Sequence, residues 1–272
     1  MIKASCLSED YAGTLGVLAE FGLSLHIEFR AHKILFDTGQ LGAFVRNAGK
    51  MNIDLAAVDA CVLSHGHFDH GGGLSRFIRE NSSAPVYLRA AALQKKYKRT
   101  LLGKFYIGIN RRLVANPFFL QRVVIVDELV EIFPDCYLLG GFAPNSSGFE
   151  PLPSNMLGAD GKQDQFSDEQ VLIIRDNGLH IFAGCSHPGI VGMLEQICDV
   201  FPGESIVSVV AGMHSRNCTV ERLQHTLDWF GKQEDIVVVP LHCTGFSECT
   251  QFRNILGDDR CELLHCGDIL EL

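Results

Sequence analysis

Residues 64–73 read SHGHFDHGGG, and this stretch constrains the fold more than any other part of the chain. The apolar run that leads into it, Val58–His65, predicts a buried strand, and the pattern that follows, Gly72–Glu80, predicts a helix. Three histidines and one aspartate therefore stand in a loop at the carboxyl end of a strand, where α/β folds usually carry their chemistry. The glycines after them allow the backbone to turn without Cβ clashes. The stretch favours an α/β fold with a functional loop at this strand end.

The side chains of this loop are of the kinds that bind transition metals. In extended backbone, residues two apart point the same way, so His65 and His67 can hold one ion from one side. Asp69 and His70 stand where the backbone turns toward the helix, and their side chains can reach a second ion beside the first. Imidazole and carboxylate suit zinc, iron or manganese. We expect one or two divalent ions, with Zn²⁺ favoured over Fe or Mn.

Four ligands cannot complete two metal sites, so further ligands must come from elsewhere in the chain. Three histidines directly follow apolar, strand-like runs: His187, His214 and His242. A single histidine at a strand end is commonly structural, but three of them beside a metal loop favour ligands, and we expect His187 and His242 to bind metal. His214 is a candidate for steadying a substrate anion or for donating a proton to the leaving group, and Asp69 for orienting the nucleophile.

The rest of the chain alternates hairpin-like pairs of strands with strand–helix units. Leu23–Gly39 and Val171–Gly184 read as hairpins, the second around an Asn-Gly turn, and residues 205–256 read as strands followed by helices. This pattern predicts an α/β sandwich with the sheets inside and the helices outside. With 272 residues, 47% of them hydrophobic, the chain suits one domain over residues 1–272. Residues 92–168 are less regular and predict a loop or cap insertion.

Charge and composition narrow the classes of function. The net charge of −9 gives no electrostatic reason to bind nucleic acid, and no apolar run is long enough to cross a membrane. The first residues lack the apolar region of a signal peptide, and the ten cysteines include no CxxC pair. These features favour reduced thiols and a cytoplasmic protein, with a disulfide-rich secreted protein as the alternative. The oligomeric state stays open, a homo-oligomer included.

Residues 94–112 form a basic and aromatic segment in an otherwise acidic chain. One interpretation is a lid that binds an anionic small molecule, such as a phosphate ester or a phosphorylated pterin, with aromatic rings stacking on a ring of the substrate. Lys95, Lys104 and Tyr106 are the candidate substrate contacts in this interpretation. The alternative is a solvated loop or a contact between subunits.

The motifs, in their order along the chain, resemble those of the metallo-β-lactamase superfamily. LFDTG precedes the histidine-rich loop, and GCSHPGI and LHCTG follow it, so the resemblance covers most of the chain. The combination of GLS, GCSH, GMH and HCTG is similar to the subfamily of dihydropterin ribofuranosylaminobenzene 5′-phosphate synthase-like proteins, also described as β-lactamase superfamily II metal-dependent hydrolases. The resemblance implies an αββα four-layer sandwich with a binuclear metal centre at the edges of the sheets.

The resemblance also implies a division of the ligands between two ions. His65 and His67, with a later histidine, would hold the first ion. Asp69, His70 and His242 would hold the second. Asp37, in LFDTG, is similar to the acidic residue that lies under the site in this family and orients a ligand histidine.

The chain departs from the family pattern at the position of the aspartate that bridges the two metals. No GHTxG motif is present, and Cys185 stands where the bridging aspartate is expected, with His187 two residues later as the replacement ligand for the first ion. Cys185 could be a thiolate ligand, a bridge between the ions, or a small buried residue. The last is favoured because free cysteine is among the most buried residue types.

We therefore expect a metal-dependent hydrolase, or a related transferase, that uses metal-activated water on a phosphorylated or ester-bearing small molecule, pterin-related on the resemblance. The alternative is a non-catalytic metal-binding or redox-sensing module of the same fold. A filled coordination shell without water would favour that alternative. A di-iron oxidoreductase would need a flavin-type partner domain, and none is recognisable in this chain.

Overall fold

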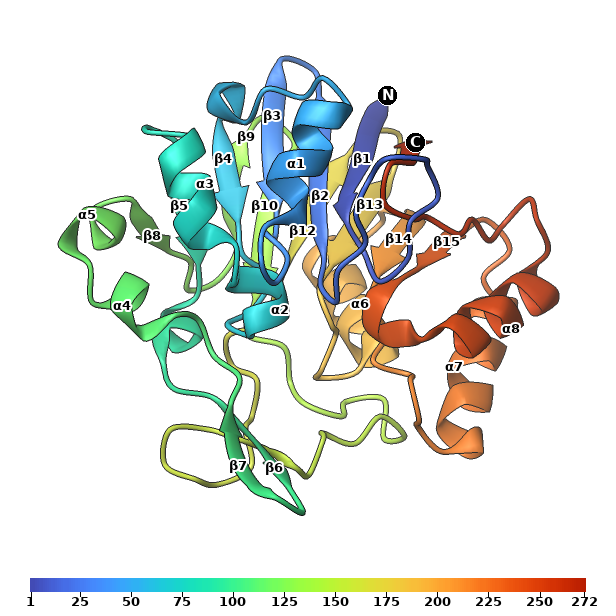
Figure 1. Cartoon of the computed structure of the whole chain (residues 1–272). Helices are drawn as coiled ribbons and strands as arrows, with labels where there is room; N and C mark the ends of the chain where they lie inside the picture. Colours follow the sequence, from blue (N-terminus) through green and yellow to red (C-terminus); the bar gives the residue numbers. More distant parts are fainter.

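Two β-sheets pack face to face, and helices cover both outer faces (Figure 1), in a computed structural model that describes residues 1–272. The seven strands of the first sheet, in spatial order, are β16 (Ile269–Glu271), β1 (Ile2–Ser8), β2 (Ser24–Phe29), β3 (His32–Phe36), β4 (Ala60–Val62), β5 (Val86–Leu88) and β8 (Val123–Ile125). The six strands of the second sheet are β15 (Val237–Pro240), β14 (Ile206–Ala211), β13 (Leu179–Ala183), β12 (Gln170–Arg175), β10 (Cys136–Gly140) and β9 (Val130–Phe133).

Alternation along the strands builds the core between the two sheets. Ile34 and Phe36 on β3 meet Leu172 on β12 and Phe182 on β13 in one fully buried apolar cluster. Every second residue of these strands points into this layer, which is why a period of two in the sequence positions both sheets. The predicted αββα four-layer sandwich is confirmed.

Amphipathic helices close the outer layers. The first sheet is covered by α1 (Ala43–Lys50) and α3 (Leu74–Glu80), whose Phe44 and Phe77 are fully buried against it. The second sheet is covered by α6 (Ile190–Val200), α7 (Val220–Gly231) and α8 (Phe246–Leu256), with Leu194, Leu227 and Phe252 buried. The apolar stripe of each helix faces its sheet and the polar residues face water.

The two hairpins expected from the sequence are present. Strands β2 and β3 pair antiparallel, as do β12 and β13. The turn of the second hairpin holds Asn177 and Gly178, both at positive φ (55° and 133°), which these residue types tolerate better than others. The pattern of Cys261–Leu272 predicts strands, but only Ile269–Glu271 forms one, and Cys261 and Cys266 instead make isolated bridges to Val238 and Ala12.

A small third sheet lies beyond one edge of the sandwich, at the bottom of Figure 1. It consists of β6 (Tyr97–Thr100), β7 (Gly103–Tyr106) and β11 (Met156–Leu157), and we call it the cap. The sequence indicates an insertion over residues 92–168. Within this range, β8 belongs to the first main sheet, and β9 and β10 belong to the second. The range also contains the short helices α4 (Arg111–Val114) and α5 (Pro117–Leu120). No helix combines the length and the apolar character needed to cross a membrane.

Candidate metal centre

The loops that follow four strands meet at the edge of the sandwich that the cap faces. The histidine-rich loop follows β4 and includes the single-turn helix α2 (Phe68–Gly71). Cys185 and His187 follow β13, His214 follows β14, and His242 follows β15 in the short helix η3 (His242–Thr244). Because β13, β14 and β15 run parallel, their carboxyl ends share this edge.

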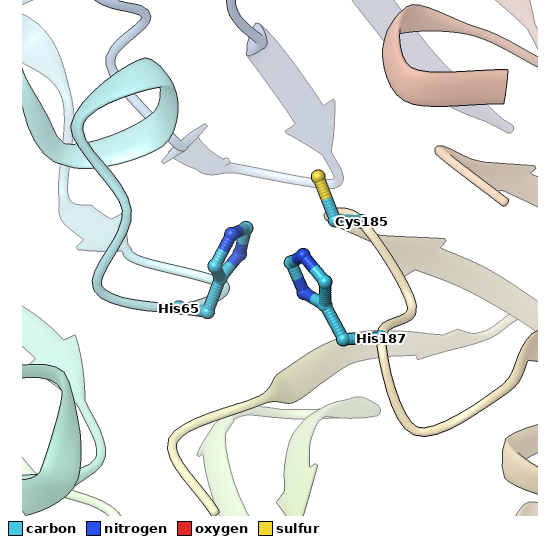
Figure 2. Close-up of side chains that lie close together, drawn as sticks. All are labelled: His65, Cys185 and His187. Carbon is cyan, nitrogen blue, oxygen red and sulfur yellow. The ribbon is translucent and has the colours of Figure 1, made fainter. Parts of the chain in front are cut away.

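His65, His67 and His187 form the first group of candidate ligands. His65 Nε2 lies 3.1 Å from His67 Nδ1. Two nitrogens bound to one tetrahedral zinc ion stand about 3.3 Å apart, given Zn–N bonds of about 2.05 Å. The His187 ring lies 4.8 Å from that of His65 and 4.9 Å from that of His67, between ring centroids. Figure 2 shows the rings of His65 and His187 facing one space, with the sulfur of Cys185 beside it.

Asp69, His70 and His242 form the second group. His242 Nε2 lies 3.5 Å from Asp69 Oδ2. His70 Nε2 lies 3.1 Å from the sulfur of Cys185, and the ligand atoms of His70, Cys185 and His242 all lie within 4.8 Å of one another. The structure thus brings together all six residues that the sequence indicates as metal ligands.

A carboxylate stands behind each of three ligand histidines. Asp37 lies 2.6 Å from Nδ1 of His70, as its motif implies. Glu169 lies 2.9 Å from Nδ1 of His187, and Asp10 lies 2.8 Å from Nδ1 of His242. A carboxylate that accepts the Nδ1 proton leaves the Nε2 lone pair free to face a metal ion and fixes the plane of the ring.

The sequence interpretation missed Asp10 and Glu169. Both are acidic residues next to the ends of β1 and β12, in the stretches SED and SDEQ. Such acidic residues are common at strand ends, so nothing in the local pattern separates these two from the others. Only the packing of the two sheets shows that they lie behind ligand histidines.

Several buried polar atoms in this centre have no hydrogen-bond partner in the protein. They are His67 Nε2, Asp69 Oδ1, His187 Nε2 and His242 Nε2. A buried polar atom without a partner costs about 1–3 kcal/mol, so a group of them at one place indicates a missing positive partner. Divalent cations fit this set of imidazole and carboxylate donors.

Electrostatics keep most of these imidazoles ready to bind a cation. Burial lowers the pKa of His67 to about 4 and holds those of His65 and His187 well below the ordinary value, so these rings are neutral near pH 7. Burial alone would raise the pKa of Asp69, but the close approach of His242 Nε2 at 3.5 Å and the other nearby imidazoles hold it below its usual range. Neutral imidazole and ionised carboxylate are the forms that bind metals.

Four residues of this centre have a strained backbone. Asp37, Ser186, His214 and His242 all have positive φ, between 46° and 58°. Residues with a side chain adopt this region at a cost, and they keep it only where the surrounding structure enforces it. The positive φ angles direct these side chains into the centre, and the surrounding structure compensates for their conformational cost.

A buried ion pair ties the histidine-rich loop to the cap. Asp168 accepts a hydrogen bond from the backbone N–H of Gly66 at 2.7 Å and one from Lys96 Nζ at 2.8 Å. Lys96 also donates to Asp164 at 2.7 Å. Phe166, between the two aspartates, stacks on the ring of His187 at 4.1 Å. Lys96 belongs to the basic segment 94–112, yet it is buried and serves the loop.

A cavity of about 410 Å³ opens onto the centre. His67, Asp69, Cys185, His187 and His214 line its floor. His214 is not part of the compact groups of ligand atoms; its ring stands 4.7 Å from that of His187. Burial, with the charge of Arg222, lowers the pKa of His214 to about 4.

The cap contributes other residues to this cavity than the three that the sequence indicated. Lys98, Thr100 and Phe105 line it. Lys95 is exposed, Lys104 Nζ lies 4.4 Å from the ring of Tyr97, and the Tyr106 hydroxyl donates to the carbonyl of Ile109; none of the three lines the cavity.

The alternation of a β-hairpin explains this placement. Lys98 pairs with Phe105 across the hairpin, whereas Arg99 pairs with Lys104. Because successive side chains of a strand point to opposite faces, Lys98 and Phe105 share the face toward the cavity, and Lys104 stands on the other. The basic composition of the segment could not show which face would meet the centre.

The chain is similar to known proteins in sequence and in fold. The sequence model of the metallo-beta-lactamase superfamily matches residues 20–139. A protein of Methanocaldococcus jannaschii named 7,8-dihydropterin-6-methyl-4-(beta-D-ribofuranosyl)-aminobenzene-5′-phosphate synthase is 28% identical over 99% of this chain and 96% of its own length. An uncharacterised protein of the same organism is 30% identical over 87% of this chain and 89% of its own length. The crystal structure of a metal-dependent hydrolase of the beta-lactamase superfamily superposes with a TM-score of 0.82 and 28% identity, over 100% of this chain and 99% of the other.

Proposed function

Because the chain belongs to the metallo-β-lactamase superfamily, we propose that it is a metal-dependent hydrolase, or a related transferase, that acts on a phosphorylated or ester-bearing small molecule. The observation that carries this proposal is a group of buried donor atoms without protein partners, among them Asp69 Oδ1 and His187 Nε2, whose residues line an open cavity. A purely structural metal site is closed by protein ligands, whereas a catalytic one keeps an accessible side.

The residues divide into two sets of ligands. His65, His67 and His187 would hold one cation, and Asp69, His70 and His242 the other. Divalent cations supply two kinds of chemistry in such centres, since they acidify water and polarise ester or phosphoryl oxygens. The donor set suits Zn²⁺, with Fe or Mn as alternatives.

Asp69 and His214 act beside the cations. Asp69 Oδ1 is free of protein partners, so this oxygen can accept a hydrogen bond from the attacking water and orient it. The low pKa of His214 keeps its ring neutral near pH 7. A neutral ring is a weak proton donor to a leaving group but a good hydrogen-bond donor to an anion, and we favour the second role.

The cavity walls suit an anion attached to a flat ring. Lys98 from the cap and Arg216 from the loop after β14 bring positive charge, and Phe21 and Phe105 bring aromatic surface. Arg216 is held by Asp10 and by the carbonyl of His242 through one nitrogen, Nη2. Its remaining donors stay available to a substrate oxygen.

A pterin-related phosphate is the favoured substrate class. The relative named as a synthase carries in its name a phosphate, an aminobenzene ring and a dihydropterin. A compound of that kind would place its phosphate against Lys98 or Arg216 and its rings against the aromatic wall. On this basis Lys98→Met should raise KM for phosphorylated substrates by about 5-fold, the effect of one exposed charge, while Lys104→Met should leave it unchanged.

The test is a screen of metal-loaded protein against phosphomonoesters, phosphodiesters and lactones. We expect turnover of at least one class, abolished by a chelator, restored by added Zn²⁺, and absent from His67→Ala. His32→Ala is the matched control, because His32 stacks on Phe133 away from the centre. If protein with its full metal content turns over none of these classes, the proposal fails and a non-catalytic metal-binding or redox-sensing module becomes the better interpretation.

A further inference from the structure

We infer that Cys185 is a thiolate ligand shared by both cation positions, and not a packing residue beside them. The inference rests on the metal centre of the proposed function and deepens it, because it concerns how the two cations are joined. Its sulfur belongs to two compact groups of ligand atoms, one with His65 and His187 and one with His70 and His242. Within each group all ligand atoms lie within 4.8 Å of one another.

The sulfur is in direct contact with one candidate ligand, at a distance somewhat shorter than that between two atoms that share a zinc ion. Sγ lies 3.1 Å from His70 Nε2. A sulfur and a nitrogen bound to the same tetrahedral zinc ion stand about 3.6 Å apart, given bonds of about 2.3 and 2.05 Å. The sulfur also stands beside the space that His65 and His187 face (Figure 2). It therefore lies between the two groups of histidines.

The surroundings of Cys185 differ from those of a buried packing cysteine. Its side chain is 3% exposed, yet it lines the cavity and faces imidazole nitrogens instead of the apolar clusters of the core. Cys61 and Cys136, in contrast, lie inside those clusters. Burial alone therefore does not account for a cysteine at this position.

The local backbone delivers the side chain to this place. A Cβ on Gly184 would lie 2.2 Å from the hydroxyl of Ser64, so only glycine lets the end of β13 pack this closely on the histidine-rich loop. The next residue, Cys185, then points into the centre. A thiolate has one donor atom, so two cations held by these two groups would share that atom.

The neighbouring Cys243 provides an internal comparison. It also lines the cavity, but its sulfur is 3.7 Å from the carbonyl of Cys185, accepts the backbone N–H of His214 at 3.3 Å, and belongs to neither group of ligand atoms. Of these two cysteines, which lie close together in space, the geometry assigns ligation to Cys185.

The chemistry of the shared atom follows from its type. When the cations bind, the S–H bond of Cys185 breaks, its proton passes to solvent water, and two sulfur–metal bonds form. Thiolate is a soft ligand, so this centre should prefer Zn²⁺, Fe²⁺ or Co²⁺ to Mn²⁺ or Mg²⁺. A carboxylate at the same position would not discriminate in this way.

The test is the electronic spectrum of the cobalt-loaded protein, which requires no turnover. We expect two Co²⁺ per chain and a near-ultraviolet band from charge transfer between thiolate and cobalt. Cys185→Ser should lose the band, and Cys243→Ser should keep it. Cys185→Asp, which preserves the negative charge, should bind two Co²⁺ without the band, and it also serves if the serine variant does not fold.

Other outcomes overturn the inference. These are a band that survives in Cys185→Ser, a band lost only in Cys243→Ser, a wild-type spectrum without it, or a wild-type chain that binds a single Co²⁺. A chelator-sensitive turnover without the band would remove the inference and leave the proposed function intact. If the band is lost in Cys185→Ser but the protein turns over no substrate class, the inference stands and the proposed function fails.

Discussion

Three carboxylates set the direction of three imidazoles in this protein. Asp10, Asp37 and Glu169 each lie within 2.9 Å of the Nδ1 atom of a ligand histidine. They touch neither the cavity nor one another's histidines, so they position the ligands and do not take part in chemistry themselves. The effect of removing them should therefore appear in metal affinity before it appears in turnover.

Glu169→Gln and Asp10→Asn should each weaken zinc binding by about 10–100-fold, because the amide holds its histidine less firmly and makes it less basic. Competition with a coloured chelator measures this affinity. Asp135→Asn is the control, since Asp135 pairs with Arg30 and Arg175 on the surface. If Glu169→Gln and Asp10→Asn both bind zinc with wild-type affinity, these carboxylates do not support the ligand histidines.

His26 is a buried histidine outside the centre, and both of its ring nitrogens lack hydrogen-bond partners. Burial lowers its pKa in the folded protein. Between the unfolded pKa of about 6.5 and the lower folded value, the unfolded chain binds the proton and the folded chain does not. This histidine therefore stabilises the fold less as the pH falls below about 6.5.

His26→Leu should raise the free energy of unfolding by about 1 kcal/mol at pH 7.5, because it removes two unsatisfied buried nitrogens. Its advantage over the wild type should grow at pH 5.5, where the wild type carries the extra cost. Urea unfolding at both pH values measures the difference, and the acid sensitivity of the metal centre cancels in the comparison. An advantage that is constant between the two pH values would contradict this account.

At the scale of elements, the cap depends on a few buried charges for its attachment. Its strands β6 and β7 are mostly exposed, and the hairpin tip presents Leu101 and Leu102 to solvent. The buried contact of Lys96 with Asp164 and Asp168 links this small sheet to the N–H of Gly66 in the histidine-rich loop. The position of the cap, which lines the cavity, is therefore coupled to the position of the metal ligands in the histidine-rich loop.

Lys96→Met should lower the free energy of unfolding by about 3 kcal/mol, since it leaves two buried carboxylates without their cation. The exposed neighbour Lys95 gives the control, because Lys95→Met should change the free energy of unfolding by less than about 0.5 kcal/mol. Urea denaturation measures both, and hydrogen exchange should become faster at Gly66 in Lys96→Met alone. Equal stability of the two variants would mean that the buried pair has no such role.

At the scale of the whole molecule, the fold was more predictable than the fine structure of the centre. Period-two alternation, hairpin turns and strand–helix units are local patterns, and they predicted the sandwich. The candidate ligands were visible because each histidine follows an apolar strand. Asp10, Glu169 and Arg216 were not, because their roles depend on which distant segments meet. The side of the cap that faces the cavity depended on hairpin register, which composition does not show.

Both sheets supply ligands, so metal binding should stabilise the molecule as a whole. Zinc at a free concentration of 100 times its dissociation constant should add about 2.7 kcal/mol to the free energy of unfolding. Thermal unfolding with and without zinc measures this effect, which His67→Ala should reduce and His32→Ala should preserve. A zinc effect of the same size in both variants would place the stabilising ion elsewhere.

The pairing of Asp10 with His242 has a consequence for biosynthesis. The second cation position needs the side chains of Asp10 and His242, which are 232 residues apart in the sequence. A growing or truncated polypeptide can therefore form the loop around His65 and His67 before His242 has been synthesised. Completion of the centre reports that synthesis has passed residue 242 and that two segments 232 residues apart have met.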